Sequence, residues 1–208
     1  VSNVGFVANW NTVSSANYYE VDVMRIFSTT EDAEYLSLYE DFLLMQEYPS
    51  EVTGYLDGLT YRWDWYLYGG KLADRSIVFP QTSSKGQTQL QTPMMDFSGE
   101  GETETVYFSF VAEGAVGDKI GIGYYYTDDE GEDLAFAFQP VTFEEGTMTK
   151  TLYAELPAVD ALGFLIYTDP TMQNTGDVKL KTFLVSREFA AGTEFMEVYD
   201  YRQLSLIH

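Results

Sequence analysis

Aromatic and charged side chains lie close together between residues 62 and 68, a combination that is typical of sugar-binding sites. The members of this group are Arg62, Trp63, Asp64, Trp65, Tyr66 and Tyr68. Exposed aromatic rings can stack on the apolar faces of sugars, while flanking polar groups hydrogen-bond to hydroxyls. A second aromatic group, Tyr124 to Tyr126, follows later in the chain. The open alternative is that these rings only cover a sheet face or a seam between domains.

Residues 61–68 are expected to be extended, with Trp63, Trp65 and Leu67 on one face and the intervening residues on the other. Because successive side chains of a strand point to opposite faces, some rings must point away from the core. Tyr66 and Tyr125 are the best candidates for exposed rings. The predicted glycan-binding residues are Trp63, Trp65, Tyr66, Tyr68 and Tyr125.

Catalytic chemistry has few residues to draw on. His208 is the only histidine and there is no cysteine, which excludes a Ser-His-Asp triad, a thiol nucleophile and a zinc site built on these ligands. Glycoside hydrolysis needs only two carboxylates, so it is the enzyme class that remains. Glu20 and Asp22 begin the Glu-x-Asp-x-x-Glu pattern of laminarinase-type glycosidases, but Arg25 stands in place of the second glutamate. We therefore expect that the chain is not an enzyme.

The 208 residues carry a formal net charge of −22, from 33 acidic and 11 basic side chains. Such a surface repels phosphate backbones and anionic lipid headgroups, which argues against nucleic acid and direct membrane partners. No apolar run reaches the ~18 residues of a membrane span. Neutral glycans, cations and basic protein surfaces are compatible with this charge, and so is plain solvation of an extracellular surface.

The hydrophobic pattern has the period of strands. Val106, Phe108 and Phe110 alternate with more polar residues, and Gly121 and Gly123 lie inside another strand, where glycine permits close backbone approach. The same period of two recurs at 120–126, 134–138, 148–154 and 162–166. Hydrophobic residues make up 45% of the chain, enough for a packed core. The pattern predicts an all-β fold, an antiparallel β-sandwich.

Residues 31–46 have two interpretations. Apolar residues recur there at spacings of three and four, at Tyr35, Leu38, Phe42 and Met45. This spacing favours a helix that ends before Pro49. A strand or loop is the alternative, and a family resemblance in the same region favours it.

Residues 6–23 resemble the start of a fibronectin type III domain. The stretch begins Phe6-Val-Ala-Asn-Trp10 and continues to Tyr18-Tyr-Glu-Val-Asp-Val23. In that family a tryptophan of the second strand packs on a tyrosine of the third, and Trp10 and Tyr19 are the matching positions. The resemblance implies a partial fibronectin type III-like segment over residues 1–30.

Most of residues 39–193 is similar to jelly-roll modules of Bacteroidetes surface proteins, the cleaved-adhesin and galactose-binding-like group. The similar pieces are Tyr39-Glu-Asp-Phe42, Leu90-Gln-Thr-Pro-Met-Met-Asp-Phe-Ser98, Thr105-Val-Tyr-Phe-Ser-Phe110 and Lys181-Thr-Phe-Leu-Val185. The resemblance implies a jelly-roll sandwich over 31–193 and a return strand of the fibronectin-like part over 194–208. It also implies that the chain is part of a longer multidomain protein.

Some members of this group hold calcium, and the resemblance favours Glu40 and Asp41 as its ligands. Calcium takes oxygen ligands, which these carboxylates offer. The acidic pair that members often carry after the last strand is replaced here by Val185 and Ser186. A structural calcium ion is therefore left open, and no other cofactor is expected.

Three functions fit the sequence. A non-catalytic extracellular adhesion or spacer module of a bacterial surface protein is the main interpretation. A carbohydrate-binding module with exposed aromatics is the alternative, and a glycoside hydrolase is the third. We expect a glycan or a surface protein as the partner. No charged-then-apolar leader follows Val1, so we expect a processed, exported chain at the cell surface, in the periplasm or outside the cell.

Overall fold

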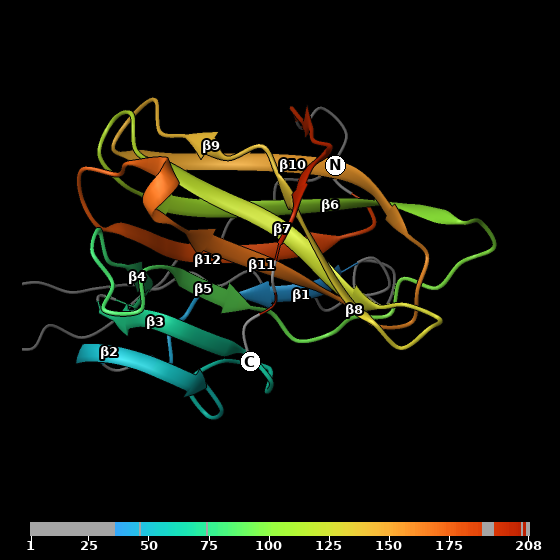
Figure 1. The fold of residues 1–208 in the computed structure, drawn as a ribbon, viewed down its shortest axis with the longest axis horizontal. Coiled ribbons are helices and arrows are strands. Elements are labelled where there is room, and N and C mark those ends of the chain that lie inside the picture. Colours follow the sequence, from blue (N-terminus) through green and yellow to red (C-terminus); the bar gives the residue numbers. More distant parts are fainter. Residues whose placement is uncertain (1–35, 46, 74, 189–193, 205, 207–208) are drawn as a thin grey trace, which may run out of the picture.

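The computed structural model describes residues 36–45, 47–73, 75–188, 194–204 and 206 (Figure 1). These residues form strands and one short 3-10 helix, η1 (Pro170–Met172), and none of their helices is long and apolar enough to cross a membrane. The strands are β1 (Leu36–Glu40), β2 (Tyr48–Tyr55), β3 (Tyr66–Leu72), β4 (Ile77–Phe79), β5 (Thr88–Gln91), β6 (Thr103–Glu113), β7 (Lys119–Thr127), β8 (Asp133–Phe138), β9 (Val141–Thr142), β10 (Thr147–Pro157), β11 (Leu162–Thr168), β12 (Val178–Ser186), β13 (Met196–Glu197) and β14 (Asp200–Gln203). The predicted all-β class is confirmed.

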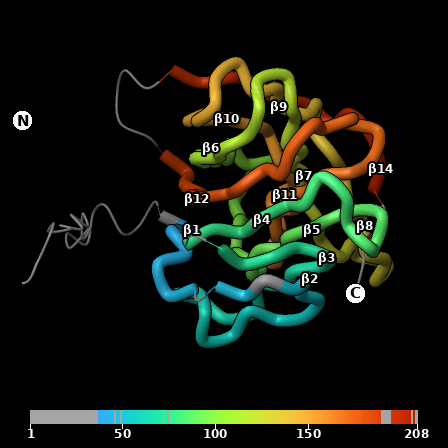
Figure 2. The backbone as a smooth tube through the Cα atoms, turned by 90° about the vertical axis from the view of Figure 1, so that its left-hand side faces the viewer, coloured from blue at the N-terminus to red at the C-terminus, as the bar shows by residue number. Residues whose placement is uncertain are grey.

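The strands join into one sheet that bends back on itself. Their order is β13-β10-β6-β12-β4-β3-β5-β11-β7-β8-β14, with β1 on β12, β2 on β3 and β9 on β7. Figure 2 shows the chain following this bend from β10 and β6 to β3 and β2. Phe108 of β6 lies 5.5 Å from Phe138 of β8 and 5.0 Å from Phe164 of β11, measured between ring centres. Strands β6 and β12 therefore face β8 and β11 across a core, in an antiparallel sandwich of jelly-roll type.

Strand β6 shows how the sequence forms this core. Val106, Phe108, Phe110 and Ala112 are buried, while the residues between them are partly exposed. Each fully buried phenylalanine contributes roughly 1.5–3 kcal/mol relative to an exposed one. The period of two is thus read correctly from the sequence, and it fixes which face of β6 joins the core.

The helix that apolar spacing favours over 31–46 is wrong for the residues described. Leu36–Glu40 is the strand β1, which pairs antiparallel with β12. Phe42 has a φ of 56°, a left-handed conformation that a right-handed helix does not contain. Leu38 and Phe42 are buried from this strand and turn. Pairing with β12 and burial of these two side chains outweigh the local helical spacing.

The segment after residue 193 adds short strands to both layers. Strand β13 pairs with β10, and β14 pairs with β8. The assignment of this segment to a fibronectin-like domain stays a prediction. Trp10, Tyr19, Glu20 and Asp22, on which the fibronectin and glycosidase comparisons depend, lie outside the described residues.

Candidate functional site

A groove of about 590 Å³ opens beside the ends of β2, β3 and β5. Its aromatic lining consists of Tyr55, Trp63, Tyr66 and Tyr125. Its charged and amide groups are Arg62, Asp64 and Gln91. The two aromatic groups that are distant in the sequence therefore meet, because β3 pairs with β5, β5 with β11 and β11 with β7. Three of the five predicted glycan-binding residues line this one groove.

Trp63 is the ring most available to a ligand. Its side chain is 70% exposed, although a tryptophan is usually well buried. Tyr55 and Tyr66 lie opposite each other on β2 and β3, and their rings meet edge to face with centres 5.2 Å apart. This contact holds two rings in place beside the free indole. An exposed apolar surface with polar groups around it is typical of an interaction site.

The prediction that Trp65 belongs to the glycan site is wrong. Its side chain is fully buried, and its ring packs edge to face on Phe42 with centres 5.7 Å apart. The extended conformation is interrupted at Asp64, which has a φ of 70°. The side chains of Trp63 and Trp65 therefore do not share one face, as strict alternation had predicted. Trp65 belongs to the core and Trp63 to the surface.

Tyr68 and Tyr125 have different positions on the outer face of the sheet. Tyr68 is half-buried on β3 and does not contribute to the lining of the groove. Tyr125 lines the groove but is only 8% exposed. Its hydroxyl donates to the carbonyl of Thr92 at 2.6 Å, and its ring lies so close to Gly163 that a Cβ there would come within 2.4 Å. The expected outward direction of Tyr125 is right, but the expected exposure is wrong because neighbouring groups cover the ring.

Glu40, a predicted calcium ligand, connects β1 to the loop that carries Trp63. Its carboxylate is fully buried. One oxygen accepts from the backbone N–H of Phe42 at 2.9 Å and the other from that of Tyr61 at 2.7 Å. The Glu40 carboxylate therefore positions the backbone two residues before the exposed indole.

Two further contacts hold the same loop. The Arg62 guanidinium donates to the carbonyl of Ser37 at 2.9 Å. The backbone N–H of Asp64 donates to the Asp57 carboxylate at 3.1 Å. The loop before β3 is thus fixed on both sides of Trp63, so the indole needs little further ordering when a ligand binds.

Asp41, the other predicted calcium ligand, also accepts protein hydrogen bonds. Its carboxylate takes the backbone N–H of Leu43 at 3.2 Å and the Tyr39 hydroxyl at 3.4 Å. Within the described part of the chain, no group of three or more acidic or histidine side chains could hold a metal ion. Calcium binding by Glu40 and Asp41 stays a prediction.

Glu40 gives the stability of the fold a pH dependence. Burial raises the pKa of Glu40 to about 7, although the N–H groups of Tyr61 and Phe42 act in the opposite direction. In the unfolded chain the ordinary value of about 4.5 applies. Between these values the folded protein keeps a proton that the unfolded chain releases. The contribution of protonated Glu40 to the free energy of unfolding is therefore complete at low pH and is lost as the pH rises through about 7.

We expect the Glu40→Gln variant to show a flatter dependence of the free energy of unfolding on pH. Between about pH 5 and about pH 8, the wild type should lose up to about 3 kcal/mol through this group, whereas glutamine does not titrate. Urea unfolding at both pH values measures the difference. The exposed Glu145→Gln is the matched control and should keep the wild-type slope. Equal slopes for Glu40→Gln and the wild type would contradict the raised pKa.

Comparison with known proteins leaves the family open. No family model and no curated protein sequence matches the chain. Among solved structures, PfGH50B is similar at 9% identity and a TM-score of 0.41, over 61% of this chain and 22% of that one. A carbohydrate binding module of family 29 is similar at 14% identity and a TM-score of 0.38, over 69% of this chain and 90% of that one.

A family 16 carbohydrate binding module is also similar, at 11% identity and a TM-score of 0.35, over 63% of this chain and 92% of that one. The chain thus spans about a fifth of the length of PfGH50B and nearly the full length of the two binding modules. Likenesses at these identities and TM-scores carry no inference about function.

Proposed function

We propose that the chain is a non-catalytic carbohydrate-binding module whose groove at Trp63 holds a neutral sugar. The observation that carries this proposal is the 70%-exposed indole beside the paired rings of Tyr55 and Tyr66. The apolar face of a sugar can cover the indole, while Arg62, Asp64 and Gln91 offer donors and acceptors for its hydroxyls. Rings and convergent polar groups in one groove favour ligand binding over a spacer without a ligand.

The charges of the groove favour a neutral sugar. Arg62 and Asp64 contribute one positive and one negative group to the lining. The whole chain carries a net charge of −22, which repels sulfated and carboxylated glycans over a distance. A neutral glycan meets no such repulsion.

Binding without hydrolysis is supported by the carboxylates of the groove. Asp64 is the one carboxylate among the described residues that line it. Both retaining and inverting glycosidases in general use a pair of carboxyl groups across the scissile bond. A single carboxylate can accept a hydrogen bond from a sugar hydroxyl, which is the role that we assign to Asp64.

An adhesion role is compatible with sugar binding. A module of an exported surface protein would attach that protein to glycans through the Trp63 groove. Adhesion, the function that the sequence favours, would then come from glycan binding in the Trp63 groove.

A glycan array with neutral and anionic oligosaccharides tests the proposal. We expect binding to neutral glycans and weaker binding to anionic relatives, with the difference shrinking at high salt because screening reduces the repulsion. Repeating the array with a chelator shows whether calcium contributes. Absence of binding by the folded protein to any glycan would contradict the proposal and would favour a spacer.

A further inference from the structure

Two strongly exposed aromatic rings line the same groove. Beside Trp63, whose side chain is 70% exposed, the groove contains Tyr55, which is 66% exposed. Met94, at 39%, adds a third exposed apolar side chain to the lining. A ligand that covers both rings would remove more apolar surface from water than a ligand that covers Trp63 alone.

Trp63 and Tyr55 form two separate platforms for stacking. Tyr66 follows Trp63 by three residues, up to about 10 Å along the chain, and it lies directly opposite Tyr55 on β2. The Tyr55 ring meets that of Tyr66, whereas the indole of Trp63 makes no ring contact with the described residues. One sugar ring is about as large as one aromatic ring, so it covers one platform. A ligand needs linked sugar units to use both.

The two platforms border a common floor. Burial raises the pKa of Tyr125, and the Tyr55 hydroxyl and the Asp64 carboxylate raise it further. Tyr55 and Asp64 therefore both lie near the Tyr125 hydroxyl, which donates to the carbonyl of Thr92. Asp64 is the residue after Trp63. The groove thus extends from the loop that carries Trp63 to Tyr55 on β2.

The groove has room and reachable polar groups for more than one sugar unit. Its volume of about 590 Å³ lies in the range of pockets that hold drug-sized ligands, which are larger than a single hexose. Arg62 and Asp64, the neighbours of Trp63 in the chain, are both exposed. A bound sugar chain can therefore reach their donors and acceptors with its hydroxyls.

We infer that the groove binds a neutral oligosaccharide along its length, with one sugar unit stacked on Trp63 and a further unit stacked on Tyr55. This inference rests on the proposed function of the groove. The linkage between the units makes the second stacking contact intramolecular, so it adds to the affinity of the first. The ligand class is therefore a linked sugar chain rather than a single sugar.

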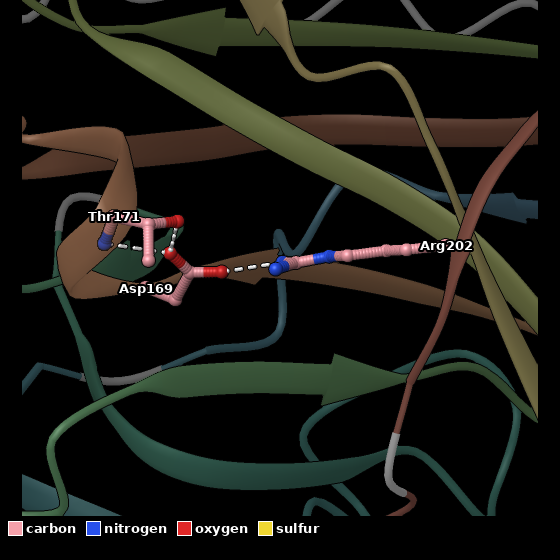
Figure 3. A network of polar contacts seen from close by, with 3 residues as sticks. All are labelled: Asp169, Thr171 and Arg202. Atoms are coloured by element: carbon pink, nitrogen blue, oxygen red, sulfur yellow. Dashed lines mark hydrogen bonds and ion pairs between the residues drawn. The ribbon is translucent and has the colours of Figure 1, made fainter.

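The affinity should stop rising once the groove is filled. The next depression along β5 is lined by Gln89 and Tyr167, which are both buried. Figure 3 shows Arg202 extending to Asp169, with a guanidinium nitrogen 2.6 Å from a carboxylate oxygen, while Asp169 also accepts from the backbone N–H of Thr171. These side chains contact one another, and the described residues that line the depression offer a sugar no exposed ring.

A ladder from monosaccharide to hexasaccharide of the neutral glycan bound most strongly on the array tests this inference by calorimetry. The tetrasaccharide should bind at least about 10-fold more tightly than the monosaccharide, a larger gain than the number of units alone gives. The hexasaccharide should bind about as tightly as the tetrasaccharide.

Replacing Tyr55 by alanine should weaken the tetrasaccharide about 10-fold and change monosaccharide binding little, because a single unit can stack on Trp63. Tyr55→Phe keeps the ring and should lose much less. Tyr48→Ala, on the same strand and 55% exposed but outside the lining of the groove, is the control and should bind like the wild type. The melting temperature of Tyr55→Ala should stay close to the wild type, since this side chain lies largely outside the core.

The outcomes separate this inference from the proposed function. If the protein binds no glycan, the proposed function fails. If the monosaccharide binds as tightly as the tetrasaccharide, or if Tyr55→Ala binds the tetrasaccharide like the wild type, the groove still holds one sugar and the second platform is overturned. A Tyr55→Phe variant as weak as Tyr55→Ala would contradict stacking on this ring.

Discussion

Replacing Trp63 by alanine is expected to weaken binding of a neutral oligosaccharide by at least about 30-fold. Truncation of a tryptophan at the centre of a binding site costs roughly 2 kcal/mol or more, which corresponds to this factor. Because the side chain is 70% exposed, its removal leaves no core cavity, and the free energy of unfolding should stay within about 0.5 kcal/mol of the wild type. Calorimetry and urea unfolding measure the two quantities.

Tyr48→Ala is the matched control for this variant. Tyr48 is 55% exposed on β2 but does not contribute to the lining of the groove. It should bind glycans like the wild type. If Trp63→Ala and Tyr48→Ala had the same affinity as the wild type, Trp63 would have no part in binding.

Replacing Trp65 by alanine should mainly lower the stability of the fold, whereas Trp63→Ala should mainly weaken binding. Trp65 is fully buried against Phe42, and loss of a large aromatic side chain from a core costs about 3–5 kcal/mol. Urea unfolding of Trp65→Ala should therefore show a large decrease in the free energy of unfolding. Trp65→Phe, which fills part of the space, should lose less.

The two tryptophan variants together test the correction made by the structure. The residues are two positions apart, yet one should affect mainly binding and the other mainly stability. A Trp65→Ala protein as stable as the wild type would contradict the buried position of this ring.

Much of the fold follows from periodicity in the sequence. In β6 the alternation of Val106, Phe108 and Phe110 with their neighbours is strong, and each strand of this kind can be recognised locally. Gly123 illustrates a prediction of close backbone approach that the structure confirms, since a Cβ there would come within 2.1 Å of the carbonyl oxygen of Phe136. Such features depend on neighbours along the chain or on the type of one residue.

The predictions that the structure contradicts fail because contacts between residues distant in the sequence determine the structure there. The helical spacing around Leu38 and Phe42 is real, but pairing of β1 with β12 determines the structure there. Trp63 is exposed and Trp65 is buried because the chain turns at Asp64, which has a positive φ. Aspartate tolerates this conformation better than most residues, but its presence alone does not predict it.

The types of residue in the site can be predicted from the sequence, but the fact that these residues lie close together cannot. Trp63, Tyr66 and Tyr125 come together through the order of β3, β5, β11 and β7, which is not encoded in any short segment. The ion pair of Arg202 with Asp169 is not apparent from the sequence either, because only the pairing of β14 with β8 brings the two residues together.

The most direct test of the Trp63 groove is an NMR titration of the tryptophan indole N–H signals with the neutral oligosaccharide selected by the array. The Trp63 signal, assigned with a Trp63→Phe variant, should shift and saturate as the glycan is added. The signal of the buried Trp65 should change little. Saturable binding with an unmoved Trp63 signal would place the glycan elsewhere and contradict the proposed site.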